Sequence, residues 1–527
     1  MPIAANPSAG TYAFENDNSA QALPAATSIG AIVGASNKGP VGERVAITDV
    51  HSFVNTFGKN DPTLTFMHFA AKAFLSEGSL LYVTRVARNA LYGGIRIATV
   101  TNFSQVQPLA AGLADPDDYV FDTDDILFIS GNNPGTWNNN IRVLAYPDTN
   151  DLDEEAFFIQ VLEGTSQVPV ETHRCTLHYK TDGLGNQLFV EDVINENSKY
   201  IKVRLNTAHP AFTSNPQAVL INAITDGYLT QGNNGDAITD AEILEGWQLY
   251  EDPEEVSINI LIQGGYNSVA VQLEMDRIAQ SRDDCMAVLD VPSAEQAAQD
   301  AVDFRRNTLN LSSSYSALYS PDLLVNDTDN GRQLYVPPSG HVAATFARTD
   351  NEAELWFAPA GLQRGVLPVF GVRHIYKLGH RNMFVDNQIN AIQFMAGQGI
   401  VVWGADTLQG FASALSDVPV RRLVSFLKTE LKQATLPSVF DPNDDFLLGE
   451  IRRIAERFMK PIKQGRGVYR YEVVCDERNN TNQTRAAGDV ILDVYIDPTR
   501  YTKRIHLNAI ATQAGGIEFA LELLDQA

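Results

Sequence analysis

The sequence has few cysteines, and none is paired with another in a metal-binding pattern. Cys175, Cys285 and Cys475 lie far apart along a chain of 527 residues. An odd number of widely spaced cysteines provides neither a disulfide framework nor the C-x-x-C pairs of a zinc site. This pattern is typical of a protein made in a reducing compartment.

Long apolar runs are also missing. No segment approaches the roughly 18 consecutive apolar residues that a membrane-spanning helix needs. The first residues, Met1 to Asn6, lack the basic segment and apolar core of a signal peptide. We therefore expect a soluble protein that is made in a cytoplasm and has no membrane partner.

Basic residues are scarce relative to acidic ones. The chain has 39 Lys and Arg against 64 Asp and Glu, so its net charge is −25. A surface this acidic repels nucleic acid and anionic lipid, and we expect no nucleic-acid partner. With 44% hydrophobic and 20% charged residues the chain is globular, and its length predicts two to four domains.

The motifs of common cofactor and metal sites are missing as well. The segment Gly34 to Pro40 has its lysine before the second glycine, whereas a phosphate loop needs it after, so we interpret the segment as a turn. Asn326 to Gly331 resembles the start of a calcium loop, but Pro337 stands where the closing glutamate is required. We therefore expect no cofactor and no metal.

No catalytic residue can be assigned from a motif either, because the sequence contains neither HExxH nor GxSxG. An α/β hydrolase-like enzyme stays open as an alternative. Such an enzyme would need a pocket where a nucleophile, a base and an oxyanion donor converge.

The first two thirds of the chain show strand and helix patterns interrupted by a different segment. Residues 25–95 and 210–350 alternate strands with helices, which predicts one α/β domain with parallel strand pairing. Residues 96–209 carry short strand-like runs between turns, which predicts a β-rich insertion. From Asp115 to Glu155 there are eleven acidic residues and one arginine, a net of −10, so we expect this part to be solvated.

Residues 351–502 have an α+β pattern and predict a C-terminal domain. Three helices are expected in it, over 387–398, 420–434 and 444–460, the last of them ended by Pro461. The overall prediction is thus a multidomain protein of α/β and α+β character.

Both ends of the chain predict extended arms. Residues 1–24 are small and polar, and the C-terminal arm, residues 503–527, begins with an alternating apolar pattern. Arms of this kind suit strand exchange, because an unpaired strand is a site of association. The arm residues that stand out are Tyr12, Phe14, Ile505, Leu507 and Ala509.

One segment of this acidic chain is basic. From Arg421 to Arg470 there are eleven Lys and Arg against six Asp and Glu, a net of +5. Two interpretations stay open: a solvated helix face, or a docking face for an acidic protein partner. The basic residues on or beside the predicted third helix are Arg452, Arg453, Arg457, Lys460 and Lys463.

The segment Tyr469 to Thr481 reads Y-x-Y-x-V-x-C-D-x-x-N-N-T and resembles the C-terminal domain of contractile phage tail sheath proteins. Further stretches are similar to that family in the same order along the chain. They include Lys38–Pro40, Leu81–Val86, Asn133–Asn139, Ser198–Ile201, Trp356–Gly361, Val420–Leu423 and Tyr495–Pro498. Asn138 stands where the family pattern N-P-G-x-W-G-N has glycine.

The resemblance implies a structural subunit of a virion tail, assembled in the host cytoplasm. Its stacked rings would form a helical sheath around an inner tail tube and contract to drive the tube through the host envelope. The C-terminal domain would face the tube, the insertion would lie outside, and the arms would add strands to neighbouring sheets. The implied partners are further copies, the tube protein, and baseplate and tail terminator proteins. The sheath of a phage-like injection particle is the other function compatible with the resemblance.

Overall fold

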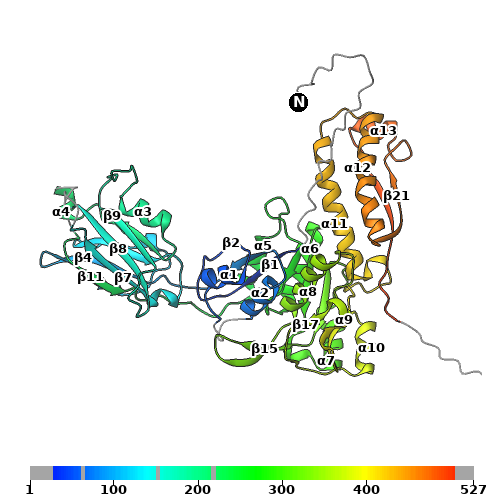
Figure 1. Ribbon diagram of the computed structural model, residues 1–527, viewed down its shortest axis with the longest axis horizontal. Coiled ribbons are helices and arrows are strands. Elements are labelled where there is room, and N and C mark those ends of the chain that lie inside the picture. The colour runs from blue at the N-terminus through cyan, green and yellow to red at the C-terminus, as the bar shows by residue number, and fades with distance from the viewer. Residues whose placement is uncertain (1–27, 61–65, 150–154, 215–220, 505–527) are drawn as a thin grey trace, which may run out of the picture.

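The computed structural model describes residues 28–60, 66–149, 155–214 and 221–504. It has a mixed α/β architecture with three visible parts (Figure 1). A central sheet with helices on both faces lies between a β-rich region on one side and a protruding helical hairpin on the other. Within the described residues, no helix is both long and apolar enough to cross a membrane.

Over the residues that the structure describes, the central sheet has nine strands, and its inner strands are parallel. Antiparallel β2, β20 and β17 occupy the two edges. Consecutive buried residues form the inner strands, as expected where helices cover both faces. In sheet order the strands are β17 (Val366–Leu367), β20 (Gly399–Val402), β19 (Ile389–Met395), β14 (Ser316–Ser320), β13 (Met286–Asp290), β12 (Ile260–Ile262), β1 (Ile29–Gly34), β3 (Leu80–Arg85) and β2 (Arg44–Ile47).

Helices cover the two faces of this sheet with separate apolar clusters. One face carries α1 (Val50–Phe57), α2 (Met67–Leu75) and α8 (Ser339–Glu352). The opposite face carries α5 (Asp240–Gln248), α6 (Val269–Arg282), α7 (Ala298–Asp303) and α10 (Leu378–Asp386).

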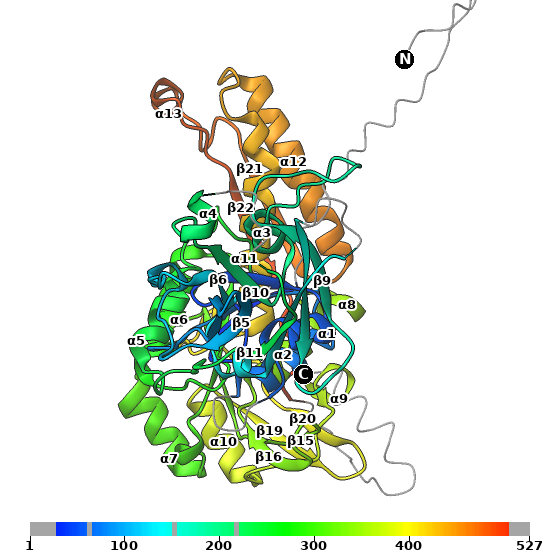
Figure 2. The same cartoon turned by 90° about the vertical axis from the view of Figure 1, so that its left-hand side faces the viewer.

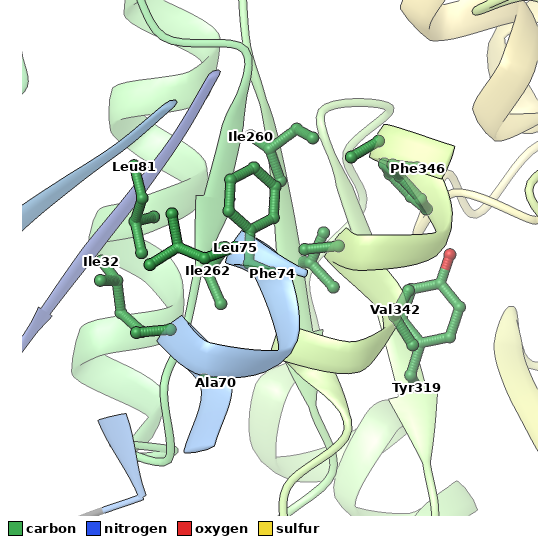
Figure 3. Packing of buried hydrophobic residues seen from close by; sticks show 14 of the residues in the cluster. Ile32, Ala70, Phe74, Leu75, Leu81, Ile260, Ile262, Tyr319, Val342 and Phe346 are labelled. Atoms are coloured by element: carbon green, nitrogen blue, oxygen red, sulfur yellow. The ribbon is translucent and has the colours of Figure 1, made fainter. Parts of the chain in front are cut away.

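Figure 3 shows part of the first cluster, in which Phe74 of α2 lies beside Ile260 and Phe346 comes from α8. The two helices cross closely, because a Cβ on Gly340 would lie 2.3 Å from the Cα of Ala70. A larger side chain at position 340 would therefore separate α8 from α2.

The sheet continues past the boundary that the sequence predicts at residue 350, because β17, β19 and β20 all belong to it. The helix expected over 387–398 is wrong, since Ile389–Met395 forms β19. Its first five residues are buried, and the first three of them pair in parallel with β14. A short strand buried on both faces has no period-2 signal that distinguishes it from a helix. The parallel strand pairing predicted within residues 210–350 is confirmed around α6, where β12 and β13 pair in parallel.

The β-rich region consists of two four-stranded sheets around one apolar cluster, together with α3 (Val190–Asn197). The first sheet is β10 (Ile201–Leu205), β6 (Asp125–Gly131), β4 (Gly94–Val100) and β5 (Phe103–Pro108). The second is β11 (Thr225–Tyr228), β7 (Ile141–Pro147), β8 (Ala156–Glu163) and β9 (Glu171–Thr176).

The acidic segment of this region is less solvated than its charge predicts. Asp125 is fully buried and pairs with Arg96 at 2.9 Å. Asp148 is also buried and pairs with Arg174 at 2.8 Å. Both arginines lie outside residues 115–155, so the sequence of the acidic segment alone does not predict these ion pairs.

The C-terminal region is built from two long helices and a two-stranded sheet. Both views show the helical hairpin protruding from the rest, with α13 at its far end (Figures 1 and 2). The elements are α11 (Val418–Thr435), α12 (Asp445–Gln464), β21 (Val468–Val474), α13 (Asn482–Ala487) and β22 (Asp493–Pro498).

A separate three-stranded sheet is formed by β15 (Leu323–Asp327), β16 (Arg332–Val336) and β18 (Gly371–Val372).

Candidate assembly surfaces of the C-terminal region

Helix α12 begins with a side-chain cap and packs one apolar face on its neighbours. The Asp444 carboxylate accepts a hydrogen bond from the backbone N–H of Leu447 at 2.9 Å. The residues of α12 that are buried are Leu447, Leu448, Ile451, Ala455, Met459 and Ile462. The prediction that Pro461 ends the helix is wrong, because the helix continues to Gln464. Gly465 follows and donates to the Pro461 carbonyl at 2.7 Å.

The opposite face of α12 carries most of the predicted basic residues. Arg453, Arg457, Lys460 and Lys463 are exposed, and none of them forms an ion pair with another residue that the structure describes. The first three lie at i, i+4 and i+7, on one side of the helix. We call these four residues the basic face of α12.

Arg452 differs from the other four. It is half-buried, and its guanidinium lies 3.1 Å from Glu456 and 3.5 Å from Asp476. Arg421 and Arg422, which add to the positive charge of the segment, are also engaged. Arg422 pairs with Asp350 of α8 at 2.6 Å, and Arg421 stacks over the Tyr315 ring at 4.3 Å. These two arginines attach α11 to the central sheet and are not available to a partner.

The tip of the helical hairpin is apolar, a feature that sequence reasoning missed. Phe440 is fully exposed and has a positive φ of 78°, and Phe446 is 72% exposed. Leu436 and Val439 beside them are more than half exposed. One phenylalanine in the connection between α11 and α12 and another at the start of α12 are the signal that could have predicted this patch.

The family-like motif Tyr469 to Thr481 has a structural role. Asn480 is buried, donates from Nδ2 to the Ile491 carbonyl at 2.8 Å, and accepts from the Ile491 N–H at 2.7 Å. Asn479 donates to the Val474 carbonyl at 2.9 Å. Thr481 caps α13 by accepting from the Thr484 N–H. The motif thereby holds the end of β21 against the segment that leads into β22.

Strands β21 and β22 form a sheet of their own. They pair antiparallel from Val468–Pro498 to Val474–Asp493, and Tyr471, Val473 and Ile496 pack toward α12. Among the described residues, neither strand has another strand on its free side. An edge of this kind presents unpaired N–H and C=O groups to a further strand.

The described chain ends on an anchored segment. The Tyr501 hydroxyl donates to the Asp406 carboxylate at 2.9 Å, and the Lys503 ammonium lies 2.8 Å from Asp417. The predicted arm residues Tyr12, Phe14, Ile505, Leu507 and Ala509 lie outside the described residues. The start of the C-terminal arm is therefore fixed beside the beginning of α11.

The carboxyl ends of the parallel strands, where α/β enzymes bind ligands, are filled by the protein's own side chains. Gln263 accepts from the Asp290 N–H at 2.7 Å, and Gln296 donates to Asp322 at 2.6 Å. Burial raises the pKa of Asp290 to about 8. Among the described residues, no group of three His, Cys, Asp or Glu is arranged to hold a metal ion.

The calcium-like loop also keeps its carboxylates engaged within the protein. The Asp327 carboxylate accepts from the side-chain amides of Asn60 and Asn330, at 3.1 Å and 2.8 Å. Asp329 pairs with Lys72 at 3.0 Å. These contacts suit a structural loop.

Comparison with solved structures assigns the fold. The sheath tail protein of Desulfitobacterium hafniense matches 93% of this chain and 96% of its own with a TM-score of 0.58 and 12% identity. The contracted sheath of an extracellular contractile injection system, the PVC sheath complex, matches 97% of this chain and 99% of its own with a TM-score of 0.54 and 15% identity. The protein is thus an α/β multidomain protein with the sheath fold.

Comparison of sequences relates the chain to tail sheath proteins. Residues 236–408 match the model of the phage tail sheath protein central domain. The tail sheath protein of Enterobacteria phage T4 is 28% identical over 299 residues, covering 53% of this chain and 45% of that relative. The tail sheath protein of Vibrio phage KVP40 is 27% identical over 336 residues, covering 57% and 50%. The central part of this chain thus matches the phage tail sheath family model, and the chain is similar to tail sheath proteins while spanning about half the length of the curated relatives it matches.

Proposed function

We propose that the protein is a structural subunit of a contractile tail sheath. Copies of the chain polymerise as stacked rings around an inner tail tube and contract to drive the tube through the host envelope. The observation that carries this proposal is the β21–β22 sheet, whose two strands have free edges among the described residues. Two strands alone are marginally stable, and further strands from neighbouring copies would complete the sheet.

The arms supply those strands in the proposed assembly. The C-terminal arm starts from a fixed point, since Tyr501 and Lys503 hold its root at Asp406 and Asp417. Main-chain hydrogen bonds to a neighbour survive a rigid-body rotation that breaks side-chain contacts. Subunits linked in this way stay connected while the sheath contracts.

The proposed radial arrangement follows from charge. The basic face of α12 turns toward the tube, and the β-rich region, which contains the acidic segment, turns outward. Contacts of exposed ion pairs contribute at most about 1 kcal/mol each. Weak contacts that are repeated along the sheath suit a sheath that must release its tube during contraction.

The tube protein, baseplate and tail terminator proteins are the other partners in this proposal, and the virion tail is the location. The sheath of an injection particle is a second candidate. It is favoured by the match to the PVC sheath, which extends over 97% of this chain and 99% of that one.

The test compares the full chain with a variant that ends at Arg504, which keeps the anchor of Lys503 but lacks the arm. Negative-stain microscopy should show tubes or rings for the full chain and monomers for the variant. Equal thermal unfolding of the two monomers is the control for folding. Tubes of normal appearance from the truncated chain would contradict the role of the arm, and discrete particles with hydrolase turnover from the full chain would contradict the sheath.

A further inference from the structure

The loop after β1, which the sequence presents as a turn, connects two regions of the protein. Lys38 on this loop places its Nζ 5.0 Å from the ring centre of Trp137 and 4.5 Å from that of Tyr200. Trp137 lies in η2 (Thr136–Asn140), and Tyr200 directly precedes β10, so both rings belong to the β-rich region. An ammonium beside two aromatic rings is attracted to each of them.

Lys38 is partly buried at this position. Burial lowers the pKa of Lys38, while Glu163 and Glu171 act in the opposite direction. Both glutamates come from the β-rich region, at the end of β8 and the start of β9. The aromatic rings and the carboxylates therefore attract the same lysine from one side of the joint.

Arg85 makes a second connection at the end of β3. Its Nη1 donates to the Gly39 carbonyl at 2.6 Å and to the Pro134 carbonyl at 2.9 Å. The first carbonyl belongs to the loop after β1 and the second to the β-rich region. Burial lowers the pKa of Arg85 to about 10, so the guanidinium is charged at neutral pH and both hydrogen bonds are charge-assisted.

A direct backbone approach makes the third connection. Gly135 has a φ of 141°, and a Cβ there would lie 2.7 Å from the carbonyl oxygen of Asn37. The Asn37 side chain accepts from Asn234 at 3.1 Å, and Asn234 accepts from the Thr136 N–H at 2.9 Å. Only glycine at position 135 allows the two regions to come this close.

The two chain segments that lead into and out of the β-rich region also pair with each other. Leu91 and Asn233 exchange backbone hydrogen bonds at 2.9 Å and 3.1 Å, and Asp236 donates to the Arg88 carbonyl at 2.8 Å. Figure 1 shows how narrow this connection is. A paired two-stranded connection could still bend, but the loop after β1 meets the β-rich region at a separate point and prevents it.

We propose that Lys38, Trp137, Tyr200 and Arg85 form an interdomain lock that fixes the orientation of the β-rich region on the central sheet. Because of this lock the joint does not bend, and the β-rich region keeps one orientation relative to the central sheet of its own subunit. It is a property of the single chain and does not depend on the function proposed above. Three of the family-like stretches, Lys38–Pro40, Asn133–Asn139 and Ser198–Ile201, meet at this joint together with Arg85 of a fourth.

The experiment measures the distance between two spin labels on the monomer, one in each region. Cysteines are introduced as Glu196→Cys on α3 and Leu273→Cys on α6, which are exposed, whereas the native cysteines are buried. Lys38→Met removes the cation and keeps the apolar stem. We expect one narrow distance distribution in the parent, and a distribution roughly twofold broader in Lys38→Met because bending becomes possible.

Two controls separate the lock from general damage. Lys38→Arg keeps a cation between the rings and should preserve the narrow distribution, as should Lys202→Met at an exposed lysine of β10. If Lys38→Met gives little folded protein, the same distance is measured in Tyr200→Leu. Tyr200 is half-buried and is one of the two aromatic rings beside the Lys38 ammonium, so its loss should also broaden the distribution. Distributions as narrow as the parent's in whichever of these variants folds would overturn the lock.

Discussion

The Lys503 ammonium lies 2.8 Å from the carboxylate of Asp417, the residue that precedes the first turn of α11. The Asp406 carboxylate lies 2.5 Å from the same ammonium. Partial burial opposes the charged form, but Asp406 and Asp417 raise the pKa of Lys503. The side chain of Asp417 is only 3% exposed, so Lys503 supplies the positive charge that this carboxylate requires.

Lys503→Glu should therefore destabilise the start of α11 and release the root of the C-terminal arm. Removing one partner of a buried pair costs about 3–5 kcal/mol, and since Lys503 is partly exposed we expect about 1–2 kcal/mol in the free energy of unfolding. Hydrogen exchange over residues 499–504 should become faster. Arg504→Glu makes the same charge change at an exposed neighbour and should leave both measurements unchanged. Equal effects of the two variants would argue against the anchor.

Asn480→Ala tests the role assigned to the family-like motif. The variant removes two hydrogen bonds to the Ile491 backbone, although the Ile491 carbonyl keeps the Asn479 amide as a donor, and we expect a loss of about 1–2 kcal/mol. We expect a lower thermal unfolding temperature and faster amide exchange in β21 and β22. Asn482→Ala, at an exposed position at the start of α13, is the control. If Asn480→Ala unfolds like the parent protein, the motif has no stabilising role in this hairpin.

Asp290 predicts a particular dependence of stability on pH. Its pKa is raised to about 8 in the folded state, well above the value of about 3.9 for an unfolded chain. Between these values the folded state binds one more proton, so this group makes the protein less stable as pH rises. Asp290→Asn removes the effect and should gain about 1–4 kcal/mol relative to the parent between about pH 5 and about pH 8.

Urea unfolding at several pH values measures this gain. Asp300→Asn, at an exposed carboxylate of α7, is the matched control. A difference between Asp290→Asn and the parent that stays constant across the range would contradict the raised pKa.

Local patterns predicted the elements that carry strong signals. Around α6 the strand and helix patterns follow one another along the chain, and the structure confirms the parallel pairing of the two strands that the helix connects. The prediction of secondary structure failed at Ile389–Met395, where burial on both faces of the strand removes the alternation of apolar and polar residues. It also failed at Pro461, which lies inside the last turn of α12 and does not end the helix. Neither outcome can be read from the segment alone, because tertiary packing decides it.

The contacts at the candidate surfaces were harder to predict because they join distant residues. Arg452 belongs to the basic stripe in sequence, but its partner Asp476 lies on the turn after β21. Lys38 meets Trp137 and Tyr200 from far along the chain, and no local spacing connects them. The exposed residues Arg453, Arg457 and Lys460 were predictable, since helical periodicity alone places them opposite the apolar face.

The last prediction concerns that basic face. If it contacts an inner tube, the outer wall of the tube should be acidic at the matching height, and the attraction should weaken as salt rises. Replacing Arg453, Arg457 and Lys460 with Glu should abolish sheath assembly on the tube and leave tube-free polymerisation intact, because these side chains have no ion-pair partner among the described residues of their own subunit. Cosedimentation of sheath with tube at several salt concentrations measures the effect. Lys199→Glu with Lys202→Glu changes charge at exposed lysines of the β-rich region and is the control. If the triple variant assembles on the tube as well as the parent does, these residues form a solvated helix face and do not contact the tube.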